Sequence, residues 1–374
     1  MAQEEIGKQL LSFSEIIESA SISPDGEVLD IATSRGLNEA ELSGILESAT
    51  KVARTLRTLK RNVVFRSQVF SAPHFAAGAA FDGFTQRGTG QVVLAGLPLA
   101  LFRYFDRKFA TLAEEWPAYP LHVPTVISAE VLGRCDYFRS FPQFVMFAGH
   151  LREEITVIEQ FRRRHATSDQ LDEEARQDLA RLDMCLSPAV CYHVYHYYEG
   201  TSLPDSGVVH GVCGRCFRYE PLKLTSEHRL RDFTMREIVF LGTAETVLAH
   251  RDRSIQRVGE FLDEHELAGD IRTASDPFFV APDALAKTYF QLRSDSKYEI
   301  SLLLSERERL AVGSHNYHSN FFGRVFRVSA GGSPMHSVCV AFGLERWVKA
   351  FLIQHGPDPA SWPACVRTAE EFRV

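Results

Sequence analysis

Several patterns are missing from this sequence, and each absence narrows what the chain can be. No apolar run of about 18 residues occurs, so a membrane-spanning helix is not expected. The N-terminal stretch Met-Ala-Gln-Glu-Glu is acidic and has no apolar segment of the secretory kind. The formal net charge of −7 gives no general case for binding nucleic acid. The seven cysteines are an odd number, which favours reduced thiols in a cytoplasmic protein over a disulfide framework.

What is present is an ordinary globular composition. Of 374 residues, 45% are apolar and 24% charged, enough to bury a large core without disulfides. Residues 1–100 are expected to be helical to about residue 60, with short strands and turns after it. From Leu101 the pattern predicts a helix, and Thr125-Val126-Ile127 is a candidate strand. Within residues 101–374, we expect a helical hairpin at 151–184 and a helical segment at 244–270.

The most informative pattern consists of two sequence motifs, one at residues 216–237 and a second at residues 343–346. Its first part is Cys216-Phe217-Arg218-Tyr219-Glu220, followed by Arg229 and by Asp232-Phe233-Thr234-Met235-Arg236-Glu237. A guanidinium presents paired donors to phosphate oxygens, and a phenylalanine ring can stack on a purine. Far downstream, Gly343-Leu344-Glu345-Arg346 follows an apolar strand pattern and places an arginine at the start of a helix. Each part alone is weak, because an isolated Arg-Glu pair is commonly a surface ion pair.

Taken together and in this order, the two parts resemble motifs 2 and 3 of class II aminoacyl-tRNA synthetases. Motif 1 of that class is a long helix and then a strand that ends at a proline, and Pro124 is the best match here, although proline is also an ordinary loop residue. The resemblance implies an α+β fold with a central antiparallel sheet flanked by helices. It also implies a homodimer formed through motif 1.

The resemblance assigns roles in the activation of a carboxylate by ATP. Arg218 would bind the α-phosphate, and Arg229 the β- or γ-phosphate. Phe233 would stack on adenine, with Arg346 on its other face or on the γ-phosphate. Glu220 would bind the adenine amino group or the aminoacyl end. The phosphates and one carboxylate, for which Glu299 is a guess, would hold Mg²⁺.

A second set of residues runs through the same motifs: Cys191, Glu237 and Cys339. We expect them on neighbouring strands of one sheet, where two thiolates and a carboxylate would form a zinc site with an open fourth position for a substrate α-amine. The alternative is that the cysteines are simply buried thiols. Archaeal-type seryl-tRNA synthetases and their truncated relatives, the amino acid:[carrier protein] ligases, use this constellation. The chain most resembles those ligases, from about Phe102 to Gln354.

Further stretches that match the ligases are Ser275-Asp276-Pro277-Phe278-Phe279, Asn316-Tyr317-His318 and Phe322-Gly323. Cys213 and Cys216 form a Cys-x-x-Cys, which suits half a zinc site or a redox pair. Because no second pair lies at suitable spacing, we interpret them as packing residues. Five histidines flank the expected pocket and receive no catalytic role: His193, His196, His315, His318 and His336.

The resemblance also indicates which molecule receives the activated amino acid. Residues 1–100 are too short and too balanced in charge for a tRNA clamp, so tRNA is not the expected partner. The ligases instead pass a small amino acid, such as glycine, alanine or serine, to the phosphopantetheine thiol of an acidic carrier protein. Arg251, Arg253 and Arg257 are the first candidates for docking that carrier, and Arg162–Arg164 the second, unless local acids neutralise them.

Two other functions remain open at this point. One is an atypical aminoacyl-tRNA synthetase. The other is a catalytically silent, synthetase-like regulator that binds an amino acid or a nucleotide. Retention of Arg218, Arg229, Phe233 and Arg346 favours an active enzyme, because a sensor need not keep every phosphate contact.

Overall fold

A large sheet organises the structure, a computed structural model that describes residues 16–23, 28–56, 62–76, 81–220, 229–274 and 295–372. Within this part of the chain the sheet has eight strands. In spatial order they are β3 (Val63–Arg66), β12 (Gly269–Thr273), β13 (Lys297–Leu303), β14 (Arg309–Tyr317), β17 (His336–Gly343), β11 (Asp232–Gly242), β10 (Val208–Phe217) and β6 (Tyr119–Leu121). Neighbours are antiparallel except β6 and β10, which are parallel. The expected α+β fold with a central, mainly antiparallel sheet is confirmed.

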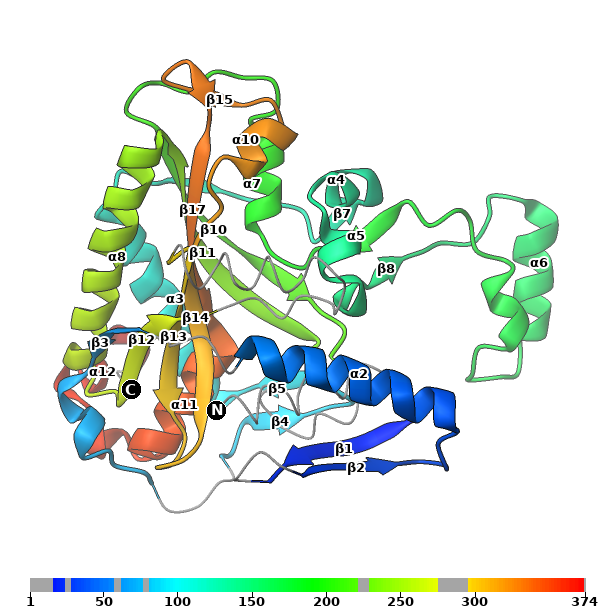
Figure 1. Ribbon diagram of the computed structural model, residues 1–374, viewed down its shortest axis with the longest axis horizontal. Coiled ribbons are helices and arrows are strands. Elements are labelled where there is room, and N and C mark those ends of the chain that lie inside the picture. The colour runs from blue at the N-terminus through cyan, green and yellow to red at the C-terminus, as the bar shows by residue number, and fades with distance from the viewer. Residues whose placement is uncertain are drawn as a thin grey trace.

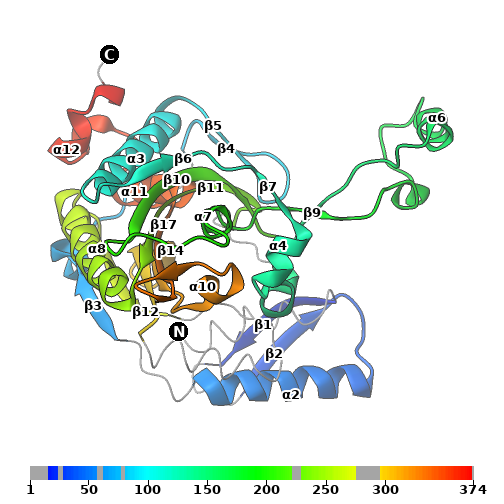
Figure 2. The same ribbon diagram turned by 90° about the horizontal axis from the view of Figure 1, so that it is seen from above.

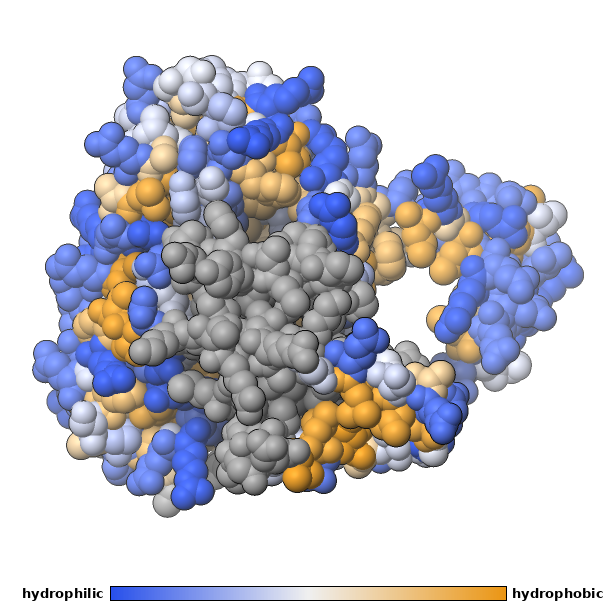
Figure 3. All heavy atoms as spheres, in the orientation of Figure 1, coloured by the Kyte–Doolittle hydropathy of each residue, from blue (hydrophilic) through white to orange (hydrophobic). Residues whose placement is uncertain are grey.

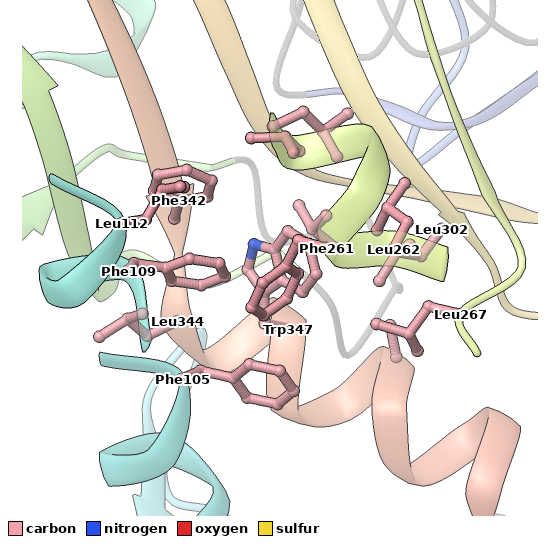
Figure 4. Packing of buried hydrophobic residues seen from close by; sticks show 14 of the residues in the cluster. Phe105, Phe109, Leu112, Phe261, Leu262, Leu267, Leu302, Phe342, Leu344 and Trp347 are labelled. Atoms are coloured by element: carbon pink, nitrogen blue, oxygen red, sulfur yellow. The ribbon is translucent and has the colours of Figure 1, made fainter. Parts of the chain in front are cut away.

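Three helices cover one face of the sheet: α3 (Gly96–Glu114), α8 (Ala244–Glu264) and α11 (Leu344–His355) (Figures 1 and 2). Side chains alternate between the two faces of a strand, so every second residue of β11 and β17 enters this helical layer. The rings of Phe109 on α3 and Phe342 on β17 stack at 4.0 Å, and Trp347 of α11 packs against both (Figure 4). This apolar core fixes the sheet on one side and leaves its other face for chemistry.

The opposite face carries α7 (Cys191–Tyr197), α10 (Phe321–Val325) and a small sheet of β7 (Val126–Ser128), β9 (Met184–Leu186) and β8 (Phe147–Ala148). Tyr195 of α7 stacks on Phe322 of α10 with centroids 4.0 Å apart. A Cβ on Gly323 would lie 2.2 Å from the carbonyl oxygen of Met335, so only glycine lets α10 approach the start of β17. This packing holds both short helices against the strand that carries Cys339.

The N-terminal region differs from its expectation. A hairpin of β1 (Ile17–Ile22) and β2 (Leu29–Thr33) precedes α2 (Glu39–Leu56), where we expected helix. Short apolar stretches do not distinguish strand from helix by periodicity, which explains the error. Asn38 and Glu41 cap α2 reciprocally, with side-chain bonds of 2.9 and 3.0 Å to each other's backbone N–H.

The boundary expected at residue 100 does not separate this region from the central sheet. β3 pairs with β12, more than two hundred residues later, and so supplies an edge strand. Strands and turns do occupy part of residues 62–100, including the hairpin of β4 (Phe84–Gln86) and β5 (Val92–Leu94). The helix expected from Leu101 begins at Gly96. Long-range strand pairing leaves no local mark in the sequence, and therefore the boundary could not be read from it.

The segment expected to be a helical hairpin, 151–184, projects from the body as an arm (Figures 1 and 2). Its first helix is α6 (Ile155–Arg164), but the second is only a short 3₁₀ helix, η3 (Glu173–Arg176). Asp172 caps η3 and also accepts a hydrogen bond from Arg164 at 2.8 Å, and Asp178 binds the same guanidinium. These local bonds satisfy the polar groups of the segment without a second α-helix. The surface over the tip of the arm is mostly hydrophilic (Figure 3).

Shorter elements complete the described chain: α4 (Ala129–Arg134), α5 (Tyr137–Ser140), β15 (Ser329–Ala330), β16 (Ser333–Pro334), α12 (Ala364–Arg367) and the 3₁₀ helices η1 (Gln68–Ser71), η2 (Pro142–Phe144), η4 (Pro359–Ser361) and η5 (Glu370–Phe372). The helical segment expected at 244–270 is α8, which ends at Glu264 before β12 begins. None of the helices in the described ranges is long and apolar enough to cross a membrane.

Candidate active site and metal centre

The predicted motif 2 hairpin is formed by β10 and β11. The two strands pair antiparallel from Val208 and Leu241 to Phe217 and Asp232. Arg218 and Glu220 follow β10 directly, and Arg229 precedes β11. The tip of the hairpin, 221–228, lies outside the described residues, as does the matching stretch at 275–279.

Arg218 lies next to the ring that was expected to hold adenine. Its Nε donates to the carbonyl oxygen of Pro188 at 3.0 Å, and its guanidinium carbon is 5.5 Å from the centroid of Phe233. The backbone contact fixes one edge of the guanidinium, while Phe233 supports it from the side. The arginine expected to bind the α-phosphate and the ring expected to stack on adenine therefore lie side by side.

Glu220 and Arg229 contact each other across the base of the hairpin. Nη1 of Arg229 donates to Oε2 of the buried Glu220 at 2.9 Å. From the sequence, we expected these two residues to make separate contacts with the nucleotide. In the structure their side chains contact each other.

Arg346 lies in the first turn of α11, which begins at Leu344 directly after β17, in line with an arginine near the start of a helix. Its Nη1 donates to the carbonyl oxygen of Ala311 on β14 at 3.0 Å. The pKa of Arg346 is lowered to about 10, mainly by burial; Glu220 and Glu299 oppose the shift, whereas the charges of Arg229 and Arg218 act in the same direction as burial. Glu220, Arg229 and Arg218 are thus near enough to Arg346 to act on its charge.

Glu345, the neighbour of Arg346, has a role that sequence reasoning missed. Its carboxylate accepts hydrogen bonds from both N–H and Oγ1 of Thr234 on β11, and from Arg215 on β10 at 3.3 Å. Burial is the main reason that the pKa of Glu345 is raised. The residue ties the first turn of α11 to the hairpin and so positions Arg346. The glutamate within Gly-Leu-Glu-Arg was the sequence feature from which this role could have been predicted.

The three predicted metal ligands come together. The sulfur atoms of Cys191 and Cys339 and a carboxylate oxygen of Glu237 all lie within 4.8 Å of one another, and all three residues are buried. Val239 pairs with Cys339 across β11 and β17, which puts Glu237, two residues from Val239, on the same face as Cys339.

One expectation about these ligands is wrong. Cys191 is not on a strand but is the first residue of α7, whereas Glu237 and Cys339 do lie on neighbouring strands. The short apolar run around Ala189 and Val190 fits a buried helix start as well as a strand, and periodicity does not separate the two.

Glu237 supplies a test of whether a metal fits. Neither of its carboxylate oxygens has a hydrogen-bond partner among the described residues, although both are buried. Burial raises the pKa of Glu237 well above its usual range. A buried carboxylate without partners is costly, and a cation between the three ligands would satisfy it.

The two thiols differ in the direction of their pKa shifts. The pKa of Cys339 is lowered, first because the Cys191 thiol donates to it, and the pKa of Cys191 is raised by the same bond. Two sulfurs and one carboxylate, with one coordination position left over, form a donor set typical of open zinc sites. The donor set and its closeness therefore fit a zinc ion.

Of the five histidines considered from sequence, His318 is the one that contacts a metal-ligand candidate, with Nε2 4.0 Å from Sγ of Cys339. The other four have different surroundings: His193 beside Ser187, His196 beside Glu199, His336 beside Tyr317, and His315 buried on the helix-covered face. Cys213 and Cys216, three residues apart on β10, face opposite sides of the sheet and remain free thiols, in line with packing roles.

The arginines of α8 are already paired. Arg257 binds Glu115 through two nitrogens and also contacts Glu260, and Arg253 lies 3.7 Å from Glu115 with its guanidinium over Trp116. Arg251 binds Asp252. Neighbouring acidic residues thus neutralise much of the positive charge on α8, the helix whose arginines were expected to dock the carrier protein.

Comparison with known proteins identifies relatives of this chain. No family model matches the sequence. The chain is 35% identical over 254 residues to amino acid–[acyl-carrier-protein] ligase 1 of Bradyrhizobium diazoefficiens, covering 66% of this chain and 74% of the relative. Ligase 2 of the same organism is 34% identical over 253 residues, 66% of this chain and 73% of the relative. The type-2 serine–tRNA ligase of Methanopyrus kandleri is 23% identical over 303 residues, 76% of this chain but 58% of that protein.

A solved structure supports the fold. The M. kandleri seryl-tRNA synthetase, crystallised with A. aeolicus tRNASec, superposes with a TM-score of 0.72 at 20% identity and covers 97% of this chain and 75% of its own. On the identity and coverage of its bacterial relatives, the chain belongs to the family of amino acid–[acyl-carrier-protein] ligases, built on the class II synthetase fold.

Proposed function

We propose that this protein activates a small amino acid with ATP and transfers it to the phosphopantetheine thiol of a carrier protein. One observation carries the proposal beyond family membership. The Cys191, Glu237, Cys339 cluster shares a sheet face with Phe233 and Met235, and Arg218 contacts both of these residues. This neighbourhood supports adjoining sites for an α-amine and for a nucleotide, as amino-acid adenylation requires.

The first step is an in-line displacement at the α-phosphate. When bound, zinc would supply a Lewis-acid position for the substrate α-amine. Arg218, fixed by Pro188 and Phe233, would bind the α-phosphate, where negative charge builds as the carboxylate attacks. Arg229 and Arg346 would hold the leaving pyrophosphate, with Mg²⁺ on the phosphates and Glu299. No side chain acts as nucleophile. The rate enhancement therefore comes from positioning the substrates and neutralising the developing charge.

The second step transfers the aminoacyl group. The carrier thiol attacks the carbonyl carbon of the aminoacyl-AMP, a thioester bond forms, and the bond to the AMP oxygen breaks. Arg218 continues to neutralise the phosphate of the departing AMP. We expect a small substrate because Tyr195, whose ring stacks on Phe322, lies one helical turn from Cys191 at the metal cluster.

We further propose that the protein is a homodimer formed through α3 and β6. β6 is the edge strand of the sheet, and its Tyr119 is 69% exposed although it is a large aromatic residue. The unpaired edge of a strand next to a large exposed aromatic side chain is a typical place for a second copy of a protein to form strand pairing. The mass of the protein in solution, measured by light scattering, tests this; a monomer at working concentration would refute it.

The experiment that tests the function has two stages. In the first, amino-acid-dependent ATP–pyrophosphate exchange is measured with zinc-replete protein across the proteinogenic amino acids. In the second, the active amino acid is supplied with holo-carrier protein, with apo-carrier protein or with total tRNA. Exchange followed by thioester formation on holo-carrier alone supports the proposal. Acylation of tRNA in place of holo-carrier would favour an atypical aminoacyl-tRNA synthetase, and no exchange at all would favour the silent regulator.

A further inference from the structure

The Cys339 sulfur is met by two nitrogen atoms from the same segment of chain. Nδ2 of Asn316 lies 3.4 Å from it, and Nε2 of His318 lies 4.0 Å from it. Asn316 is directly opposite Cys339 in the pairing of β14 with β17. The strand register therefore places the amide against the sulfur, and His318 follows two residues later, where β14 has ended.

Neighbouring groups fix which nitrogen of His318 faces the sulfur. Its Nδ1 lies 3.1 Å from Oγ of Ser337 and 3.3 Å from Oη of Tyr195. Hydroxyl groups can donate to Nδ1, which then leaves the ring proton on Nε2, the atom beside Cys339. The backbone N–H of His318 donates to the carbonyl oxygen of Ser337 at 3.0 Å, and the ring of Tyr195 is held by its stacking on Phe322.

We infer that Asn316 and His318 are positioning residues whose side-chain nitrogens hold the Cys339 sulfur in the orientation that binds the metal. The inference rests on the proposed metal centre and deepens it. Hydrogen bonds to a metal-bound thiolate stabilise its negative charge and restrict its direction, and second-layer groups of this kind typically change metal affinity by about 10- to 100-fold.

Zinc affinity tests the inference without any measurement of activity. Apo-protein would compete with a fluorescent chelator for Zn²⁺, in the wild type, His318→Ala, Asn316→Asp and His336→Ala. Asn316→Asp keeps the shape of the side chain but replaces the N–H donor with an acceptor. His336→Ala is the matched control, since this histidine is on β17, three residues from Cys339, and contacts Tyr317 on the other face. We expect a zinc Kd about 10- to 100-fold higher for the first two variants and no change for the control.

Cobalt substitution separates a hydrogen-bonding role from a merely structural one. With the same three ligands, His318→Ala should keep the visible bands of a four-coordinate site but shift the sulfur-to-cobalt charge-transfer band, because the sulfur loses a donor. Tyr195→Phe, which keeps the stacked ring, should shift the band in the same direction by less.

The outcomes are distinct. Wild-type zinc binding with weakened binding and a shifted band in the variants supports the inference. Wild-type affinity and an unmoved band in both His318→Ala and Asn316→Asp would overturn it and leave the metal centre intact. Failure of the wild-type protein to bind zinc would overturn both.

Discussion

The carboxylate of Glu345 and the backbone N–H of Thr234 are joined by hydrogen bonds of 2.9 Å, and the hydroxyl of Thr234 donates to the same carboxylate. The bond connects two motifs separated by more than a hundred residues. It fixes where α11 begins against the β10–β11 hairpin, and hence where Arg346 enters the candidate nucleotide site. The motifs are coupled by this contact as well as by the sheet.

Removal of the Glu345 carboxylate should weaken both stability and activity. We expect Glu345→Ala to lower the free energy of unfolding by about 2–3 kcal/mol, because it leaves a buried N–H without a partner and removes hydrogen bonds to a charged group. Urea denaturation followed by circular dichroism measures this. Thr234→Val, which removes only the hydroxyl, should cost about 1 kcal/mol. Equal costs for the two variants would contradict the role given to the backbone N–H.

Arg218 should matter for adenylation and not for metal binding. We expect Arg218→Ala to reduce the rate of ATP–pyrophosphate exchange by roughly 10²- to 10³-fold, the range found when one donor to developing charge is removed. Zinc content should stay at the wild-type value. Arg257→Ala, an arginine bound to Glu115 on the helix-covered face, is the control and should exchange normally. Unchanged exchange in Arg218→Ala would refute the ATP-site assignment.

The three metal-ligand candidates should act as a unit. Cys191→Ser, Glu237→Gln and Cys339→Ser should each lose stoichiometric zinc after dialysis, since a three-ligand site rarely tolerates the loss of one ligand. Cys216→Ser, another buried cysteine on the same sheet, should retain it. Metal analysis by mass spectrometry makes the measurement. Full zinc in Cys191→Ser would remove that residue from the site.

Carrier docking can be assigned to one of two surfaces. Arg253 on α8 is 53% exposed at its side chain, and Arg163 on the arm is 73% exposed. If α8 docks an acidic carrier, Arg253→Glu should raise the KM for the holo-carrier several-fold and leave ATP–pyrophosphate exchange unchanged, because like charges repel at the interface. The opposite result, an effect of Arg163→Glu alone, would transfer docking to the arm.

Stability should fall as the pH is lowered below about 6.5 because of His265. This histidine is buried between Tyr104 and Phe261, and burial lowers its pKa to about 4. Between the two pKa values the unfolded chain binds a proton that the folded chain does not. The free energy of unfolding therefore decreases on acidification by up to roughly 3 kcal/mol, at 1.36 kcal/mol per pKa unit.

Denaturation at a series of pH values measures this slope. His265→Phe keeps the stacked ring and should reduce the slope between pH 6.5 and pH 4. The slope should not vanish, since buried His315 has a pKa lowered to about 3 and acts in the same direction. An unchanged slope in His265→Phe would contradict the assignment.

The sequence by itself determined the α+β class, the motif 2 hairpin, the start of α11 and the membership of the metal cluster. Each depends on short patterns whose physical meaning is local: alternation along a strand, a glycine before a helix, or a donor type that suits phosphate or zinc. Arg218, Phe233 and Arg346 could be proposed as nucleotide contacts from the sequence because their residue types and order suit that chemistry.

Contacts between distant segments were decided only by the tertiary structure. It put Cys191 on a helix, paired Glu220 with Arg229, neutralised α8 through Glu115, and placed Asn316 and His318 around Cys339. These relationships depend on strand register and helix packing, which bring side chains within hydrogen-bond distance across gaps of up to about a hundred and forty residues. No local pattern records them, because the free energy that selects them arises when the core forms.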